Sequence, residues 1–366
     1  MKQYDYLIVG AGLFGATFAQ RMAEAGKTCL VVERRGHIAG NAYTEERDGI
    51  TVHVYGPHLF HTNDWRIWTY VNRFATFNGY HHQVQATTRD MGVVSLPINL
   101  HTLHALFGIT TPEQARAYLN RVQVRDATAD NAEEWCLRTI GWKLYDVIVK
   151  GYTIKQWGRH PRELPASIIK RLPIRLNWDN RYFSDRYEGI PVEGYTRMVE
   201  RMLCGVDVDL GVDFIKYKAE LRPLARKLVY SGPIDELFGY DAGRLDYRSI
   251  RIEHERIEMP DWQGIGQMNY TGLDVEWTRI VEPKHFAPGL RLPHTVISRE
   301  YSVSDGLPYY PIGDAINTAL AAAYQQRAIA AGYLVGGRLG RYVYYNMDQV
   351  IGMALAMADR ELRGAS

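Results

Sequence analysis

The chain opens with an apolar run, a glycine-rich turn and a stretch of helical spacing. Residues 4–9 (YDYLIV) are compact and apolar, which is typical of a buried parallel strand. The turn GAGLFG follows at 10–15, and apolar positions then recur with helical spacing over 16–25 before a glycine ends the pattern. Residues 28–32 (TCLVV) predict a second strand, so this segment is expected to form a βαβ unit.

Later parts of the chain carry both helical and strand patterns. Residues 100–175 hold several apolar stripes with helical spacing, separated by short polar or glycine breaks, and are predicted to be mainly helical. Alternating apolar and polar positions predict strands within 81–99 and between about 247 and 300. Near the end, a short strand at 333–335 leads through the turn GGRLG at 336–340 to an amphipathic helix.

Composition narrows the class of protein. The 366 residues are 46% hydrophobic, which is enough for a large core and suggests two or three domains. Lys and Arg number 43 against 41 for Asp and Glu, a formal charge of +2. So small an excess excludes a typical nucleic-acid binder, although a few arginines can still hold a small anion.

The cysteines and the apolar tracts indicate where the protein works. Cys29, Cys136 and Cys204 have no paired or metal-type spacing, which fits a reducing cytosol. The strand pattern begins by Tyr4, where a signal peptide would lie, and the longest apolar tract, 316–335, is interrupted by polar residues. We therefore expect a cytoplasmic protein without membrane insertion.

The glycine-rich turn has the context of a dinucleotide site. Gly10 permits the tight turn, Gly12 lets the backbone approach a pyrophosphate, and Gly15 lets the helix pack close to the strand. The free N–H groups of the helix N-terminus then face the phosphates. Glu33, at the end of the second strand, is placed to accept hydrogen bonds from a ribose.

Two further segments favour FAD over NAD. Residues 34–41 (RRGHIAGN) resemble the second signature of amine-oxidase-type flavoproteins, with Ala39 where that family usually has a glycine. The segment 336–340 resembles the turn whose following helix points at the flavin ring in such proteins. Because no second GxGxxG is present, a separate NAD domain is not expected.

The predicted fold is of the α/β class, with a Rossmann-like FAD-binding domain assembled from discontinuous segments, a helical-bundle domain and an antiparallel β-sheet domain. The boundaries that we expect are 1–80 with 196–246 and 311–366 for the FAD-binding domain, 100–175 for the helical domain with a mobile substrate lid, and 81–99 with 176–195 and 247–310 for the sheet domain.

Motifs along nearly the whole chain resemble the bacterial-type UDP-galactopyranose mutase family. They are GNAYT at 40–44, VYGPHLFHT at 54–62, SLPINLHT at 95–102, KGYTIKQWG at 150–158, ELPASIIKRLP at 163–173, RYFSDRYEGIP at 181–191, TRIVEPKHF at 278–286 and YYPI at 309–312. Their number and their order make chance agreement an inadequate explanation.

This resemblance implies a redox-neutral mutase that interconverts UDP-galactopyranose and UDP-galactofuranose for cell-surface polysaccharide biosynthesis. In this family N5 of the reduced flavin attacks the anomeric carbon and displaces the nucleoside diphosphate. The ring then recloses as a furanose and the diphosphate returns. NADH or NADPH would serve only to reduce the flavin, and the relatives are commonly homodimers.

The resemblance also assigns roles to residues. The catalytic group comprises Arg171 and Arg279, which match the two diphosphate-binding arginines, and His58, which would donate a hydrogen bond to the flavin. Arg171 lies in the lid at about 164–178. The residues assigned to substrate are Tyr152, Trp157, Tyr182, Phe183, Asn269, Tyr310, Tyr344, Asn346 and His82. The residues assigned to the cofactor are Gly10, Gly12, Phe14, Gly15, Glu33, Arg34, Gly40, Asn41, Arg338 and Met347.

The three histidines of one short segment raise the question of a metal. His58 and His61 have H-x₂-H spacing, and His53 is near in sequence, but we expect no cysteine or carboxylate near this Gly-Pro turn. A zinc site would need more ligands than this turn supplies. No metal is therefore expected.

Four positions depart from the galactose pattern and leave the substrate open. Asn346 stands where the family commonly has Asp, His82 where it has Asn, Ala105 where it often has Gln, and Ile148 where some members have Phe. A smaller group at 105 and 148 would leave room for the methyl of thymine, so a dTDP-fucopyranose mutase is the alternative. A UDP-N-acetylgalactosamine enzyme fits less well, and a flavin oxidase or a non-catalytic nucleotide-sugar binder remain as other classes.

Overall fold

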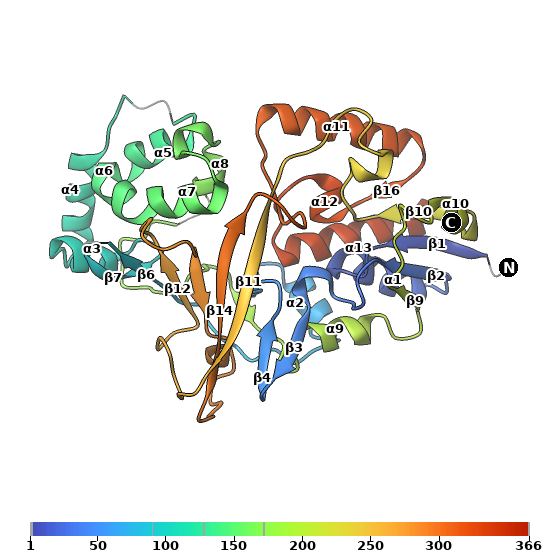
Figure 1. Ribbon diagram of the computed structural model, residues 1–366, viewed down its shortest axis with the longest axis horizontal. Helices are drawn as coiled ribbons and strands as arrows, with labels where there is room; N and C mark the ends of the chain where they lie inside the picture. The colour runs from blue at the N-terminus through green and yellow to red at the C-terminus, as the bar shows by residue number, and fades with distance from the viewer. Residues whose placement is uncertain (1–2, 90, 127–128, 171–172, 365–366) are drawn as a thin grey trace. The chain divides into compact units, whose positions relative to one another are not determined.

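The computed structural model describes residues 3–89, 91–126, 129–170 and 173–364 (Figure 1). By their internal contacts the residues divide into two units. The first unit combines Met1–Gly79, Asp185–Tyr247 and Pro308–Ser366, and the second combines Tyr80–Ser184 and Arg248–Leu307. The helices predicted for 100–175 and most of the predicted sheet share the second unit, so a separate helical domain stays a prediction.

A five-stranded parallel sheet forms the centre of the first unit, in the order β16–β10–β1–β2–β9. Its strands are β1 (Tyr4–Val9), β2 (Cys29–Glu33), β9 (Asp207–Leu210), β10 (Ala225–Tyr230) and β16 (Leu334–Val335). The βαβ unit predicted from the opening pattern is confirmed, with α1 (Leu13–Glu24) between β1 and β2. Strands drawn from three distant segments therefore share one sheet, as predicted.

Alternation along the strands divides the core of this sheet between two faces. Leu7 and Leu30 pack in one cluster with Tyr324 of α11 (Ala315–Ala330). Ile8 and Val31 are fully buried and point to the other face. There α1 covers the sheet and packs against α13 (Met347–Gly364), which Figure 1 shows alongside it.

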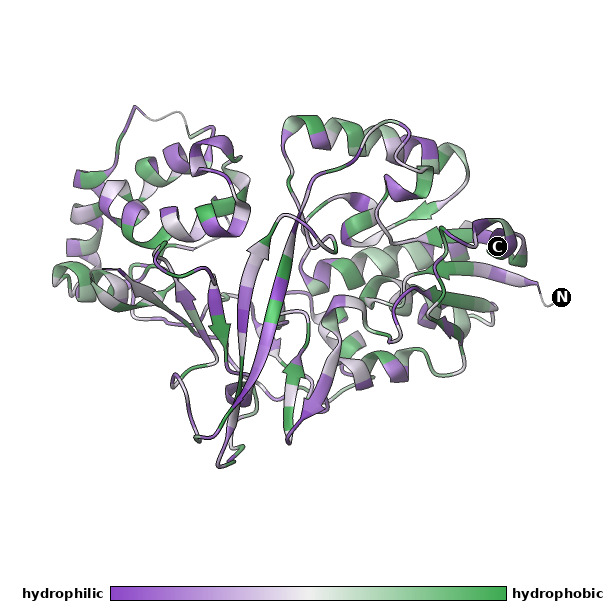
Figure 2. Ribbon diagram, in the orientation of Figure 1, coloured by the Kyte–Doolittle hydropathy of each residue, from purple (hydrophilic) through white to green (hydrophobic). Residues whose placement is uncertain are grey.

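Smaller elements complete the first unit. They are the hairpin β3 (Thr44–Arg47) and β4 (Ile50–His53), the pair β5 (Phe60–Thr62) and β8 (Tyr187–Gly189), the strand β15 (Tyr310–Pro311), and the helices α2 (Trp65–Val71), α9 (Gly194–Met202), α10 (Lys218–Leu221) and α12 (Gly337–Arg341). Figure 2 shows β3 hydrophilic along most of its length, whereas β4 beside it carries apolar residues. The segment predicted as a turn at 336–340 is instead the short helix α12, because extended Gly336 ends β16 and begins a helix directly.

The second unit is built on a sheet in which β11, β14, β13, β12, β6 and β7 follow one another. Their bounds are β6 (Val84–Thr88), β7 (Gly92–Leu96), β11 (Tyr247–Ile257), β12 (Gln267–Tyr270), β13 (Arg279–Val281) and β14 (Thr295–Val303). The predicted antiparallel pairing holds except between β6 and β12, which are parallel. That pair joins strands separated by the whole helical segment, so no hairpin constrains its direction.

The helices of the second unit lie between β7 and β8 in the chain, where the sequence predicted them. They are α3 (Leu100–Phe107), α4 (Pro112–Val122), α5 (Ala132–Thr139), α6 (Gly141–Leu144), α7 (Gly151–Trp157) and α8 (Ser167–Lys170), and Figure 1 shows α4 to α8 gathered together. Residues Tyr145–Lys150 between α6 and α7 form a π-helix. Asn99 and Thr111 begin α3 and α4 with reciprocal capping boxes, which fixes where each helix starts.

Among the described residues, every helix is either too short or too polar to cross a bilayer.

Candidate functional site

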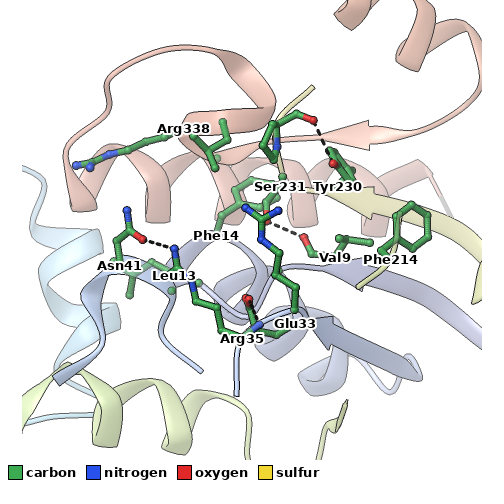
Figure 3. A pocket seen from close by; sticks show the side chains of 18 of the residues that line it. Val9, Leu13, Phe14, Glu33, Arg35, Asn41, Phe214, Tyr230, Ser231 and Arg338 are labelled. Carbon is green, nitrogen blue, oxygen red and sulfur yellow. Dashed lines mark hydrogen bonds between the residues drawn. The ribbon is translucent and has the colours of Figure 1, made fainter. Parts of the chain in front are cut away.

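A pocket in the first unit lies where the β1–α1 turn meets the loop after β2. The ends of β1, β2 and β10 and the starts of α1, α12 and α13 form its walls (Figure 3). Nine of the residues predicted to bind the dinucleotide line it: Gly10, Gly12, Phe14, Glu33, Arg34, Gly40, Asn41, Arg338 and Met347. The tenth, Gly15, packs behind the turn, and His58 is a further lining residue.

The β1–α1 turn leaves its backbone open toward the pocket. Gly10 has a φ of 102° and donates its N–H to Val32 O at 2.8 Å. A Cβ on Gly15 would lie 2.0 Å from the carbonyl oxygen of Gly10, so only glycine lets α1 start this close to β1. Gly12 begins α1 and supplies no side-chain cap. The first N–H groups of this helix are therefore oriented for an anion, as phosphate sites require.

Glu33 is held rigidly at the end of β2. Its Oε2 accepts a hydrogen bond from Ala11 N at 3.0 Å, and its Oε1 accepts one from Arg35 N at 3.0 Å. The side chain is buried. Each carboxylate oxygen keeps a second lone pair, which fits the predicted contact with ribose hydroxyls.

Arg35 is a pocket residue that the sequence reasoning missed. Its Nη2 donates to Asn41 Oδ1 at 2.9 Å, and its guanidinium lies 4.5 Å from the ring centre of Tyr55. Its Nη1 is buried and donates to no described residue. Arg34, which was predicted instead, contacts Glu236 at 3.4 Å. An unpaired donor in a lined pocket fits an anionic ligand, and the second arginine of the Arg34–Arg35 pair was the available signal.

The turn around Ala39 keeps the conformation that a glycine would adopt. Ala39 has a φ of 70° and donates its N–H to Ala11 O at 2.9 Å. Left-handed backbone is uncommon for alanine, so this position carries some strain. A Cβ on Gly40 would lie 3.0 Å from Gly12 Cα, so the two glycine-containing turns come into close contact.

The C-terminal wall of the pocket depends on Gly336 and on Arg338. A Cβ on Gly336 would overlap the ring of Phe14, at 1.9 Å from its Cζ. The Arg338 Nε donates to Tyr345 O at 2.5 Å, and the guanidinium lies 4.6 Å from the ring centre of Tyr344. Met347 is buried at the first position of α13. The chain thus returns to the pocket from a segment more than 300 residues after the glycine-rich turn.

His53 and His58 form a linked pair in the β4–β5 connection. His58 donates its backbone N–H to His53 Nδ1 at 3.0 Å, and His58 Nδ1 lies 2.8 Å from Gly56 O. A carbonyl only accepts, so Nδ1 of His58 carries the proton. The Nε2 of the neutral ring is then an acceptor, and the predicted hydrogen-bond donation to a flavin would need the imidazolium form.

His61 has a carboxylate partner that the sequence could not reveal. Its Nδ1 contacts Asp185, which also receives a hydrogen bond from Asn63. The two residues are brought together because β5 pairs with β8, just after Asp185. The expectation that no carboxylate lies near this turn is therefore wrong.

Burial of His53 predicts an acid sensitivity. Burial, together with the neighbouring His58, lowers the pKa of His53 to about 3, from an ordinary value of 6.5. Between these values the unfolded chain binds a proton that the folded protein does not, so stability falls as pH decreases below 6.5 and is complete above it. We expect this group to cost about 2 kcal/mol on going from pH 7.5 to pH 5.

The variant His53→Asn tests this prediction, because an Asn oxygen can still accept from His58 N. Thermal or denaturant unfolding followed across this pH range should show a smaller loss for the variant than for the wild type. His104→Asn, at an exposed histidine, is the matched control and should keep the wild-type slope. Equal slopes for all three proteins would contradict the assignment.

Three of the predicted substrate residues belong to the first unit. Tyr310 and Tyr344 have ring centres 5.6 Å apart. Asn346 directly precedes α13, where its backbone N–H donates to Gln349 Oε1 at 2.9 Å. Its place directly before Met347 is the N-cap position of that helix.

In the second unit, Asn269 and Arg279 are opposite one another across a hairpin. They are paired residues of β12 and β13, so their side chains lie on the same face of the sheet. Asn269 Oδ1 accepts a hydrogen bond from Gln267 Nε2 at 2.9 Å. The amide of Asn269 therefore keeps its NH₂ group as a donor, which suits a carbonyl of a pyrimidine base.

Arg279 is ion-paired to Glu300, a residue that the sequence reasoning missed. Arg279 Nη2 lies 2.6 Å from Glu300 Oε1, and Glu300 is 1% exposed. Oε2 of Glu300 is buried and accepts no hydrogen bond from a described residue. The pair arises because Arg279 and Glu300 are register partners of β13 and β14. A buried carboxylate here fixes the orientation of the guanidinium.

His82, Tyr182 and Phe183 lie close together in the second unit. Tyr182 N donates to His82 O at 2.7 Å, and the ring centres of His82 and Phe183 are 6.1 Å apart in a stacked arrangement. His82 is 2% exposed. The histidine that stands here in place of the family's Asn thus adds an aromatic ring to an aromatic cluster.

Tyr152 and Trp157 belong to α7, and both are half-buried. Trp157 packs against the apolar core of the helical part of this unit. Of the positions considered for thymine, Ile148 lies in that same core and Ala105 is exposed on α3. Arg171 lies outside the described residues, as does position 172 of the predicted lid.

A separate polar cluster in the second unit contains Asp261, Glu282 and His285, whose ligand-type atoms lie within 4.8 Å of one another. His285 Nε2 is 3.5 Å from Glu282 and 3.2 Å from Asp261, and both carboxylates raise the pKa of His285, Glu282 most. When it is protonated, the imidazole balances part of their charge. The cluster joins the loop before β12 to the segment after β13.

Comparisons with known proteins bear on the whole chain. The family described as UDP-galactopyranose mutase matches residues 147–344, and an NAD(P)-binding Rossmann-like domain matches residues 8–74. The chain is 41% identical to a probable UDP-galactopyranose mutase of Klebsiella pneumoniae, over 99% of this chain and 96% of that one. It is 35% identical to a dTDP-fucopyranose mutase of Escherichia coli, over 96% of this chain and 97% of that one.

Solved structures show the same fold. A structure described as reduced UDP-galactopyranose mutase is similar with a TM-score of 0.80 at 16% identity, covering 100% of this chain and 95% of the other. A putrescine oxidase structure is similar with a TM-score of 0.54 at 14% identity, covering 99% of each chain.

Proposed function

Because the chain belongs to the UDP-galactopyranose mutase family, we propose that it interconverts UDP-galactopyranose and UDP-galactofuranose without net redox change. The observation that carries this proposal is similarity along 99% of the chain to a probable enzyme of this activity at 41% identity. The glycine-rich turn, buried Glu33 and the Arg279–Glu300 pair are the parts that such an enzyme needs. We expect a cytoplasmic homodimer that takes a nucleotide sugar as its substrate.

FAD is the cofactor that the pocket fits. Glycine at 12 leaves room for a pyrophosphate against the start of α1, Glu33 is fixed to accept from a ribose, and Arg35 has an unused buried donor. Arg338 and the start of α13 would lie along the flavin end. When bound and reduced, with NADH or NADPH as the external electron source, the flavin supplies the nucleophile for the anomeric carbon.

The side chains of this protein would bind and orient the sugar nucleotide. Arg279, held by Glu300, would stabilise the negative charge that develops on the diphosphate as it leaves, together with Arg171 from the lid. Tyr152 would stack on the uracil and Asn269 would donate to its edge. Charge stabilisation of this kind is strongest where water is excluded, which a closing lid would achieve.

The direct test uses the chemically reduced enzyme with UDP-galactofuranose and dTDP-fucofuranose in parallel. We expect a higher kcat/KM for the uridine sugar, with a pyranose product and no stoichiometric consumption of reductant. A much higher value for the thymidine sugar would favour the alternative, which is supported by the 35% identity to a dTDP-fucopyranose mutase. Oxygen consumption with an amine or alcohol would instead indicate an oxidase.

A further inference from the structure

The ammonium group of Lys155 in α7 donates three hydrogen bonds to backbone carbonyls of one segment. Its Nζ donates to the carbonyl oxygens of Tyr270 at 2.8 Å, Trp277 at 2.9 Å and Val275 at 3.2 Å. An ammonium group has three donors, so none remains for solvent or ligand. Tyr270 is the last residue of β12, and Val275 and Trp277 lie in the connection between β12 and β13.

That connection is flanked by the two hairpin residues predicted to bind the substrate, one in β12 and one in β13. Asn269 is next to Tyr270 at the end of β12, and Arg279 begins β13 two residues after Trp277. Because Asn269 and Arg279 are register partners, the path of the loop decides where both side chains start. Lys155 therefore holds the closed end of the hairpin from outside the sheet.

The helix that supplies Lys155 also carries Tyr152 and Trp157. The same loop meets α7 at its first residue, where a Cβ on Gly151 would lie 2.3 Å from Thr271 O. Thr271 Oγ1 in turn donates to Val147 O at 2.8 Å. The helix thus contacts the loop closely at Gly151, and the ammonium group of Lys155 binds the loop one helical turn later.

Keeping a lysine at this position is costly. Burial lowers the pKa of Lys155 to about 8, with Asp274 opposing the shift, so the half-buried cation is less favoured than an exposed one. Apolar side chains would make a purely structural contact between a helix and a loop at a smaller cost in desolvation free energy. Cation-to-carbonyl bonds are directional, and they fix the position of the helix along the hairpin as well as the contact.

We propose that Lys155 is a positioning residue for nucleotide binding: it holds the helix of Tyr152 and the hairpin of Asn269 at a fixed separation, so that the base stack and the polar contact to the base are satisfied together. This inference rests on the proposed function, which assigns those two side chains to the uracil. Lys155 itself touches no ligand, and its whole effect passes through the backbone of residues 270–277.

The first experiment measures UDP binding by calorimetry and steady-state kinetics for Lys155→Met. We expect Kd for UDP and KM for the nucleotide sugar to rise at least tenfold, about 1.4 kcal/mol, while kcat at saturating substrate changes less than about threefold. Lys150→Met is the matched control. Lys150 precedes α7 directly and pairs with Asp146 at the surface, so Kd should stay at the wild-type value.

A double-mutant cycle tests whether Lys155 acts through Asn269. If it does, Asn269→Ala weakens UDP binding less in the Lys155→Met protein than in the wild type, because the displaced hairpin has already lost much of that contact. In the Lys150→Met background the effect of Asn269→Ala should be unchanged. Additive losses in both backgrounds would overturn the proposal, because Lys155 would then affect UDP binding independently of Asn269.

A measurement on the unaltered protein covers the case in which Lys155→Met does not fold. Hydrogen exchange with and without UDP should show the amides of 151–157 and of 270–277 protected together by similar factors. Protection of one segment without the other would overturn the proposal. Failure of the wild-type protein to bind UDP at all would instead contradict the proposed function, so the two failures are distinguishable.

Discussion

Replacing Arg279 with methionine is expected to lower kcat/KM for the nucleotide sugar by about a thousandfold or more, which corresponds to about 4 kcal/mol. Nη2 of Arg279 lies 2.6 Å from Oε1 of the buried Glu300. The guanidinium is therefore oriented before the substrate arrives and does not have to reorganise. Steady-state kinetics with the reduced enzyme measures the effect. Arg299→Met is the control, since Arg299 lies on the adjoining strand and pairs with Glu255 at the surface, and its activity should stay within about twofold.

Loss of Arg279 has a second consequence that must be separated from the first. It leaves the Glu300 carboxylate buried without its partner, which should destabilise the protein by about 3–5 kcal/mol. The double variant Arg279→Met with Glu300→Met removes both charges and should recover most of the stability but none of the activity. Activity above about a tenth of the wild-type value in a folded single variant would show that Arg279 does not bind the leaving group.

Gly15→Ala is expected to prevent flavin binding. The new Cβ would lie 2.0 Å from Gly10 O and 3.2 Å from Ile8 Cγ2. Neither atom is the end of a flexible side chain with room to move, so the turn itself must shift, and a displacement of about 1 Å in such a site costs about a hundredfold in function. The purified variant should therefore lack the yellow colour of the wild type, and added FAD should bind at least about a hundredfold more weakly.

Gly36→Ala is the matched control for this change. Gly36 lies in the loop after β2, its φ is outside the left-handed region, and a Cβ there meets no atom within 4 Å. We expect wild-type flavin content and a change in stability within about 0.5 kcal/mol. A yellow Gly15→Ala protein with normal FAD affinity would show that the turn does not carry the pyrophosphate.

Local pattern was enough to predict the first half of the nucleotide-binding unit. The run 4–9, the glycine spacing and Glu33 each have a short-range meaning, and the structure has them as a strand, a turn and an anchored carboxylate. The motif resemblance then placed residues from 40 to 347 around one pocket. The strand and the turn could be predicted in this way because each depends on residues close together in the chain.

Two ion pairs and one strand pair that the sequence did not reveal depend on register between distant strands. Glu300 meets Arg279 only because β13 pairs with β14, and Asp185 meets His61 only because β5 pairs with β8. The parallel pair of β6 and β12 joins two strands about 180 residues apart. Lys155 looked like any helical lysine, because its three acceptors are backbone carbonyls that carry no residue signature.

The π-helix at Tyr145–Lys150 has a consequence for how the following helix is interpreted. Each π turn takes about one residue more than an α turn. The side chains after this segment therefore point in other directions than they would after a continuous α-helix. A helical wheel drawn continuously from Gly141 would therefore assign residues of α7 to the wrong sides. A relative with one residue fewer in the π-helix would turn other side chains of its following helix toward the same neighbours. This would be so even if the rest of its sequence aligned with this chain without a gap.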